Sequence, residues 1–261
     1  MSTSQKFPPL AVVFLSFPLL LLLQWPSSLL IHNVSITLGV LLNESIFVAG
    51  IPLLIILKYK TPLQEAFPFK KPDAKALWWA IVMTFALVIL IDYLTFLSEK
   101  IFPPSREIKT MLEKIMDVDG FGETTWRWFL ICLTPALCEE FFFRGFFQNM
   151  LGHHWGKKIS LILTAVFFAL IHGIVVYWHL YLLLGFYLGW LMLVGKNLWF
   201  PIIAHLINNS WTFLTHPLGH TLPRGGIWLP HDSLIMLACV IVFAISVGRL
   251  EGCPSCRCRT L

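Results

Sequence analysis

The sequence predicts an all-α fold, a polytopic transmembrane bundle of about eight helices around a buried polar cavity. Apolar residues make up 57% of the chain and charged residues only 13%. With a mean hydropathy of +0.76, this composition lies far from that of a water-soluble domain. Apolar runs long enough to cross a bilayer recur along the whole chain. One run nevertheless carries three charged side chains at membrane depth, which must face a protein or water interior and not lipid.

Eight apolar runs define the expected helices in chain order. They occupy residues 9–31, 36–57, 77–97, 126–150, 158–178, 180–195, 198–215 and 232–249. A spanning helix needs roughly 20 residues; the sixth and seventh runs are short and meet at a tight junction, residues 195–197. The first run follows a single lysine, contains two prolines and has no clear small-residue cleavage site. We therefore expect it to be a retained helix and not a removed signal peptide.

Two stretches between the runs differ in composition. Residues 59–75 carry three prolines among lysines and aromatics, which suits a strip along the inner membrane interface. Residues 98–125 are of mixed charge, and their apolar side chains follow helical spacing, which predicts an amphipathic helix on the outer side. We divide the chain into N-terminal helices with these two stretches (1–125), a central core (126–215), and an outer loop, last helix and Cys-rich tail (216–261).

Lysine and arginine are unevenly distributed between alternate loops. With the N-terminus inside, twelve of the nineteen fall on the inner side, six on the outer side and one within a helix. Because inner loops are enriched in these residues, we expect an integral, multi-pass protein of the plasma (inner cell) membrane with both termini cytoplasmic. The net charge of +5 then reflects topology, and nothing in its distribution indicates nucleic-acid binding.

The charged side chains at membrane depth are Glu139, Glu140 and Arg144, within the run 126–150. Facing lipid, they would cost roughly 8 kcal/mol or more to insert. Residues four apart share a helix face, so Glu140 can pair with Arg144. Glu139 lies about 100° further around the helix and is free to face a different partner. The simpler alternative is a purely structural ion pair between helices.

Two further expected helices carry polar groups. The fifth contains His172, one turn after Phe168, and the seventh contains His205, one turn before Asn209. A lone histidine in a membrane helix is more often a hydrogen-bonded packing residue, but two of them beside a glutamate pair favour chemistry. A carboxylate, two imidazoles and a carboxamide in one buried cavity suffice to activate water and to stabilise an oxyanion.

These groups form three motifs that occur in a fixed order on three membrane helices. The motifs are Glu139-Glu140-x-x-x-Arg144, Phe168-x-x-x-His172 and His205-x-x-x-Asn209. In this order they resemble the CPBP family, which comprises CaaX prenyl endopeptidases and bacteriocin-processing or immunity proteins, also called the Abi family. The resemblance covers roughly residues 125–214. The third motif ends in Asn where other members have Asp, and both occur in the family.

The resemblance implies an all-helical intramembrane protease with three pairs of site residues. Each pair has its own role: Glu139 and His172 activate the hydrolytic water, His205 and Asn209 stabilise the tetrahedral oxyanion, and Glu140 and Arg144 hold the site together. No serine or cysteine lies suitably beside a base, so a covalent acyl-enzyme is not expected.

Metal dependence has two readings. Glu139, His172 and His205 resemble a catalytic zinc set, but the sequence lacks the HExxH helix that places two ligands one turn apart. We therefore favour metal-free glutamic chemistry without a cofactor, with zinc on these three residues as the alternative. The tail cysteines Cys253, Cys256 and Cys258 have zinc-like spacing, but they are only three thiols without a nearby histidine.

The favoured function is that of an intramembrane endopeptidase, whose partners are the lipid bilayer and a membrane-anchored or lipidated protein substrate. A prenylated C-terminus, a bacteriocin leader and a C-terminal sorting helix are all compatible with a site at membrane depth. One alternative is a proton-coupled transporter, although the chain shows no inverted repeat. Another is a catalytically idle immunity or scaffold member of the same family, although every expected polar residue is present.

Overall fold

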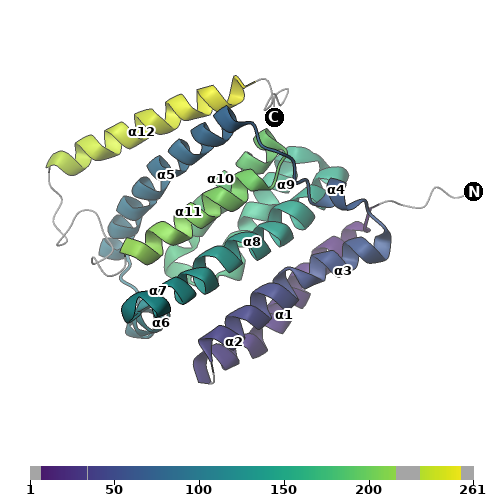
Figure 1. The fold of residues 1–261 in the computed structure, drawn as a ribbon, viewed down its shortest axis with the longest axis horizontal. Coiled ribbons are helices and arrows are strands. Elements are labelled where there is room, and N and C mark those ends of the chain that lie inside the picture. Colours follow the sequence, from purple (N-terminus) through teal and green to yellow (C-terminus); the bar gives the residue numbers. More distant parts are fainter. Residues whose placement is uncertain (1–6, 34, 216–229, 254–261) are drawn as a thin grey trace, which may run out of the picture.

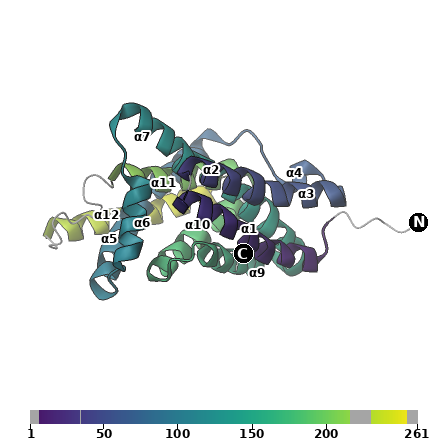
Figure 2. The same cartoon turned by 90° about the horizontal axis from the view of Figure 1, so that it is seen from below.

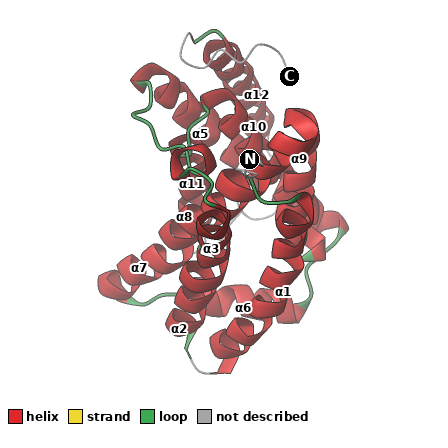
Figure 3. Ribbon diagram, turned by 90° about the vertical axis from the view of Figure 1, so that its right-hand side faces the viewer, coloured by secondary structure: helices red, strands yellow, loops and turns green. Residues whose placement is uncertain are grey.

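The computed structural model describes residues 7–33, 35–215 and 230–253, and within these ranges every regular element is a helix (Figure 3). The predicted all-α fold is therefore confirmed. In chain order the elements are α1 (Leu10–Asn33), α2 (Ile36–Leu41), η1 (Leu42–Val48), α3 (Gly50–Tyr59), α4 (Leu63–Ala66), α5 (Ala74–Ile101), α6 (Arg106–Met116), α7 (Gly120–Trp128), η2 (Phe129–Leu133), α8 (Thr134–Glu140), η3 (Phe141–Gln148), α9 (Asn149–Ile171), η4 (Val175–Tyr177), α10 (Trp178–Gly195), α11 (Trp199–Thr215) and α12 (Pro230–Glu251). The segments η1, η2 and η3 are π-helical turns inside longer helices, and η4 is a 3₁₀ turn.

Most predicted helices are found within a few residues of their expected bounds, but the central pair differs. The expected helices 126–150 and 158–178 belong to one helical stretch, Gly120–Ile171, which is broken at Gly156 (φ 79°, ψ 170°). The second arm ends at Ile171 because Gly173 adopts a left-handed conformation (φ 66°), which glycine tolerates without steric cost. His172 consequently lies at the end of its helix and not in the middle of it.

Five helical stretches in the described part of the chain are long and apolar enough to cross a membrane. They are Ile36–Tyr59, Ala74–Ile101, Gly120–Ile171, Val175–Gly195 and Asp232–Glu251. The third has 52 residues, enough for two crossings at roughly 20 residues each. A shorter apolar stretch, Leu10–Gln24, lies within α1. Together with α11, these segments form the polytopic helical bundle that the hydropathy pattern predicts.

The helices form one bundle in which α11 lies inside. Figure 1 shows α12 and α5 side by side along one edge and the layer of α1, α2 and α3 along the opposite edge. Between them, α11 contacts α5, α8 and α10. In this inner position the polar side chain of His205 on α11 is buried among other helices and does not face lipid.

The beginning and the end of the described chain can be placed relative to the two ends of the bundle. At one end, the ring of Phe7 stacks on His153 with centroids 3.9 Å apart, and the Cys253 thiol lies 3.8 Å from a carboxylate oxygen of Asp73. The opposite end carries α6 and α7 (Figure 2). The described beginning and end of the chain therefore lie at the same end of the bundle, as the alternation of basic loops predicts.

The proline-rich stretch 59–75 packs across the end of the core. Phe67 stacks on Phe141 with centroids 4.3 Å apart, and the side-chain amide of Asn197 donates to the carbonyl oxygen of Lys70 at 2.8 Å. A Cβ at Gly145 would lie 2.5 Å from the Phe67 ring. Gly145 therefore lets this strip approach η3 closely.

The expected amphipathic helix of the segment 98–125 is α6. Its first turn is capped by the Ser105 hydroxyl, which accepts a hydrogen bond from the backbone N–H of Ile108 at 3.4 Å. Such a cap satisfies one of the otherwise unpaired N–H groups at a helix start. None of the residues of α6 is fully buried, so the helix lies on the surface of the bundle.

Two glycines on α10 bring this helix close to the helix that carries the charged motif. The side chain of Arg144 donates to the carbonyl oxygen of Gly185 at 3.1 Å, and Gln148 donates to that of Gly189 at 3.0 Å. Two donor side chains four residues apart on one helix thus bind two carbonyl groups four residues apart on α10. Small residues at this spacing are typical of close helix pairs in membranes, and here they expose backbone carbonyls to buried polar side chains.

We expect Gly185→Ala to lower the free energy of unfolding by about 1–3 kcal/mol, the usual cost of overpacking. A Cβ at this position would lie 3.1 Å from the Phe168 ring and 3.2 Å from the backbone of Ala165. Gly248→Ala in α12 is the matched control, because its Cβ would meet nothing within 4 Å. Thermal unfolding in detergent micelles measures both variants, and equal midpoints would contradict the close approach.

Candidate active site

The centre of the site is a fully buried ion pair. Arg144 donates from Nη1 to Oε1 of Glu140 at 2.7 Å, and both side chains are 0% exposed. The second guanidinium nitrogen donates to Gly185, and the Phe168 ring lies 4.4 Å from the guanidinium carbon. A cation over an aromatic face is stabilised by the ring quadrupole, more strongly where water is excluded. The pairing predicted from the four-residue spacing is thereby confirmed.

His205 joins this pair from α11. Its Nδ1 lies 2.8 Å from Oε1 of Glu140, the same oxygen that accepts from Arg144. Because a carboxylate only accepts hydrogen bonds, Nδ1 of His205 carries the hydrogen. The carboxylate of Glu140 therefore connects α8 to α11, in addition to its contact along its own helix.

Glu139 faces a different partner, His172. Oε2 of Glu139 and Nε2 of His172 lie 3.9 Å apart. The other imidazole nitrogen, Nδ1, lies 2.7 Å from the carbonyl oxygen of Phe168. Since a carbonyl only accepts, Nδ1 donates, and in the neutral ring Nε2 is a hydrogen-bond acceptor that faces Glu139.

The two glutamates differ in exposure as well as in partner. Glu139 and His172 retain 16% and 20% of their side-chain exposure, whereas Glu140 has none. The helix geometry that separates neighbouring residues by about 100° thus directs Glu140 into the protein and leaves part of the Glu139 side chain exposed. Oε2 of Glu139, which faces His172, is buried and has no hydrogen-bond partner in the described residues.

Asn209 lies one turn after His205 on α11. Its side-chain oxygen accepts a hydrogen bond from the amide of Asn208 at 3.3 Å. The structure therefore gives Asn209 a neighbour on its own helix as partner, and its role toward an oxyanion stays a prediction.

The turn that carries the glutamates lies between two π-helical segments. η2 ends at Leu133 and η3 begins at Phe141, immediately after Glu140. A π-turn inserts one extra residue per turn and rotates the side chains that follow, and such turns occur often at functional sites. The periodicity of an ideal helix did not predict them.

Two residues at the site were missed by the sequence analysis. Glu44 in η1 is 6% exposed, and its carboxylate interacts electrostatically with that of Glu139 across the contact between η1 and α8. An acidic residue inside the apolar run 36–57 was a signal that could have identified it. Tyr181 in α10 stacks on His172 with centroids 4.0 Å apart and an angle of 21°. Nothing in its sequence context distinguishes it from other aromatic residues.

The alternative zinc set is not assembled in the described part of the chain. No group of three or more His, Cys, Asp or Glu side chains lies there in an arrangement that could hold a metal ion. Nδ1 of His205 is directed to Glu140, whereas His172 faces Glu139. In the tail, Cys253 is described, while Cys256 and Cys258 lie outside the described residues.

Comparison with protein families identifies the segment that holds this site. Residues 121–211 match the model of the family described as Type II CAAX prenyl endopeptidase Rce1-like. This segment is similar to that family over about a third of the chain. It contains all three motifs and all six candidate residues, and the resemblance drawn from the motifs is confirmed. Comparison with curated proteins and with solved structures gives no match.

The match to the Rce1-like family indicates the general class of protein to which this segment is similar. The family name is that of an endopeptidase, so the chain carries a protease segment of the CAAX type. With five helical stretches in its described part that can cross a membrane, the chain is an integral, multi-pass membrane protein. The helices α1 to α6 and α12 lie outside the matched segment.

We expect Glu140→Gln to lower the free energy of unfolding by about 3–5 kcal/mol, because a buried charge that loses its partner is strongly destabilising. Arg144 would then stay charged without a carboxylate. Glu139→Gln is the matched control, since its carboxylate makes no ion pair with an arginine or lysine in the described residues. Thermal unfolding in detergent compares the two variants, and equal losses would contradict the assignment of Glu140 to structure.

Proposed function

We propose that this protein is an intramembrane endopeptidase that hydrolyses a peptide bond in a membrane-anchored or lipidated protein, with water activated by Glu139 and His172. The observation that carries the proposal is the partly exposed Glu139–His172 pair, beside a buried ion pair and inside an endopeptidase family segment. The reaction needs a base, an oxyanion donor and a water molecule.

The geometry of the pair suits the activation of water. Glu139 accepts hydrogen bonds as a carboxylate, and His172 accepts at Nε2 because its Nδ1 donates to Phe168. A water molecule about 2.8 Å from each acceptor fits their separation of 3.9 Å. Such a water must donate both hydrogens to the pair. Its lone pairs are then directed away from both groups, toward a bound peptide carbonyl.

Proton transfer follows from this arrangement. As the water oxygen bonds to the carbonyl carbon, one O–H bond breaks and the proton passes to Glu139. When the C–N bond breaks, the same proton passes to the nitrogen of the leaving amine, and Glu139 returns to its carboxylate form. The glutamate acts first as base and then as acid, and no covalent enzyme intermediate is required.

His205 and Asn209 would stabilise the oxyanion. Because Glu140 accepts from Nδ1 of His205, this ring offers a second N–H, at Nε2, only as an imidazolium. Asn209, one turn along the same helix, supplies an amide donor. Glu140 and Arg144 would act by positioning these groups.

Several observations favour hydrolysis over the alternatives. The family match favours a protease over a proton-coupled transporter. The contacts among Glu139, Glu140, Arg144, His172 and His205 favour an active member over an idle one. Among the three substrate classes, the family description favours a prenylated C-terminus.

We further propose that the chain lies in the plasma membrane with both termini cytoplasmic. The end of the bundle that holds Phe7 and Cys253 also holds the lysine-rich connections 58–75, 157–158 and 196. The enrichment of basic residues on the inner side of membrane proteins supports this orientation.

We expect Glu139→Gln to abolish cleavage of a farnesyl-cysteine peptide by the purified protein, because a neutral amide cannot take the proton of the water. His205→Ala should lower turnover by about 10²–10³-fold through loss of an oxyanion donor. Glu107→Gln, at an exposed position on α6, is the control and should keep full activity. Release of the C-terminal residues, followed by mass spectrometry, measures all three. Cleavage by Glu139→Gln at the rate of the unsubstituted protein would refute the proposed role.

We expect activity to survive exhaustive chelation, since the proposed chemistry uses a glutamate and an imidazole without a metal ion. Elemental analysis should find less than one zinc per chain in the active protein. His172→Ala and His205→Ala should lose activity without a change in metal content. One tightly bound metal per chain, lost in these variants and able to restore activity when added back, would establish the zinc alternative instead.

A further inference from the structure

The imidazole of His172 lies at a helix end. His172 follows the last residue of α9 and precedes Gly173, whose left-handed conformation (φ 66°) turns the chain away from the helix. The last turn of a helix lacks part of the hydrogen bonding of the interior, and helix ends open more readily than helix centres. The proposed mechanism instead needs a fixed ring, because Nε2 of His172 must face Glu139. The ring therefore needs support from outside its own backbone.

The hydrogen bond of this ring does not fix its plane. Nδ1 of His172 donates to the carbonyl oxygen of Phe168 at 2.7 Å. Donors approach a carbonyl oxygen over a broad range of directions, so one such bond is compatible with several orientations of the imidazole. The direction of the Nε2 lone pair then depends on the side chains that pack against the ring.

Two aromatic rings pack against the imidazole, and one of them is nearly parallel to it. The Phe168 ring, from the same helix, lies 4.7 Å away between centroids and is tilted by 54°. The Tyr181 ring, from α10, lies 4.0 Å away with an angle of 21°. Because a parallel stack follows the plane of its partner, the contact of Tyr181 restrains the plane of His172 more directly than that of Phe168.

The position of Tyr181 follows from the close contact between α9 and α10. Tyr181 and Gly185 are four residues apart and share a face of α10, as Phe168 and His172 share a face of α9. A Cβ at Gly185 would lie 3.1 Å from the Phe168 ring, and the Gly185 carbonyl accepts from Arg144. One turn further along both helices, Tyr181 meets His172. The contacts that hold the buried arginine thus also set the register of this stack.

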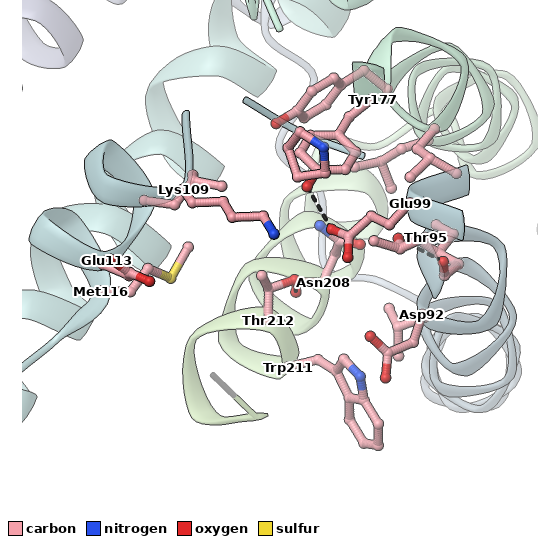
Figure 4. Close-up of a pocket in the computed structure, with 17 residues that line it drawn as sticks. Asp92, Thr95, Glu99, Lys109, Glu113, Met116, Tyr177, Asn208, Trp211 and Thr212 are labelled. Carbon is pink, nitrogen blue, oxygen red and sulfur yellow. Dashed lines mark hydrogen bonds between the residues drawn. The ribbon is translucent and has the colours of Figure 1, made fainter. Parts of the chain in front are cut away.

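The beginning of α10 is also bound to α5. Tyr177, at the end of η4, donates to the carboxylate of Glu99 at 2.5 Å (Figure 4). Nε2 of His179 lies 2.7 Å from the hydroxyl oxygen of Ser98. Tyr181 follows both residues within about one turn, and it also lines the cavity of about 400 Å³ drawn in Figure 4. The backbone that carries Tyr181 is therefore anchored, while its side chain borders free space.

We propose that Tyr181 is a positioning residue of the candidate site, which holds the imidazole of His172 in the orientation that directs Nε2 to Glu139 and to the hydrolytic water. The inference rests on the proposed function and adds a residue that acts through His172, without contact to the reacting atoms. The stack needs a planar ring at position 181 and does not need the hydroxyl group. Phenylalanine should therefore replace the tyrosine, and an aliphatic side chain should not.

Kinetics of cleavage of the farnesyl-cysteine peptide compare the two kinds of substitution. We expect Tyr181→Leu to lower kcat by about 10- to 100-fold, because small displacements of a reacting group are costly. KM should stay unchanged, since the lost contact serves the chemical step and not the binding of the peptide. Tyr181→Phe should retain the kcat of the unsubstituted protein. Phe186→Leu is the matched control, because it removes an aromatic ring at an exposed position of the same helix.

Nuclear magnetic resonance of histidine-labelled protein in detergent tests the contact without any cleavage. A proton above the face of an aromatic ring resonates upfield, so the Hε1 signal of His172 reports the stack. The signal is assigned by its loss in His172→Gln. We expect it to move downfield in Tyr181→Leu and to keep its position in Tyr181→Phe and Phe186→Leu. Tyr181→Met is a second ring-free variant, since methionine fills irregular gaps, and unfolding midpoints verify that the compared proteins are folded.

The outcomes separate this inference from the function on which it rests. Turnover by Tyr181→Leu and Tyr181→Met at the unsubstituted rate, or a His172 signal that stays in place in both, would overturn the positioning role. Equal losses of turnover in Tyr181→Phe and Tyr181→Leu would overturn it as well, because the hydroxyl group would then be required. A His172 signal that moves only in the ring-free variants, in a protein that cleaves no peptide, would support the stack and overturn the endopeptidase function.

Discussion

The burial of one guanidinium group constrains the rest of the bundle. Arg144 is held by Glu140 on its own helix, by the carbonyl of Gly185 on α10 and by the ring of Phe168 on α9. Through Glu140 the same network reaches His205 on α11. Because an unpaired cation in a membrane interior is costly, each of these helices must keep its register for the charge to stay satisfied. Four helices are thereby fixed around the place where His172 meets Glu139.

Adjacent positions in one motif meet opposite physical demands. A carboxylate that balances a buried arginine must exclude water, whereas a carboxylate that exchanges a proton with water must be reachable. Glu140 and Glu139 face different sides of the helix, with 0% and 16% of the side chain exposed, which suits Glu140 to the first demand and, in the proposed mechanism, Glu139 to the second. In the proposed mechanism, structure and chemistry thus depend on different side chains.

The sequence predicted the features that lie within a single helix, but not the contacts between helices that are far apart in the chain. The apolar runs located the helices, and the four-residue spacing predicted the pair of Glu140 and Arg144, because both are local properties of one helix. Contacts between helices, such as that of Tyr181 with His172, depend on a register that periodicity does not contain. The helix end at Ile171 was also missed, since hydropathy continues past the left-handed Gly173. Glu44 could have been identified from the sequence, because it is an acidic residue inside the apolar run 36–57. Its position near Glu139, however, is known only from the structure.

The spacing of the buried ion pair has a consequence for how the chain enters the membrane. Glu140 and Arg144 are one turn apart in the same helix, so their charges neutralise each other as soon as that helix forms. The pair itself can therefore enter the membrane without net charge, before α10 and α11 have been synthesised. Gly185 and His205, which follow later in the chain, then find a preformed pair and complete its hydrogen bonds. An ion pair shared between distant helices would instead leave a bare charge in lipid until its partner arrived.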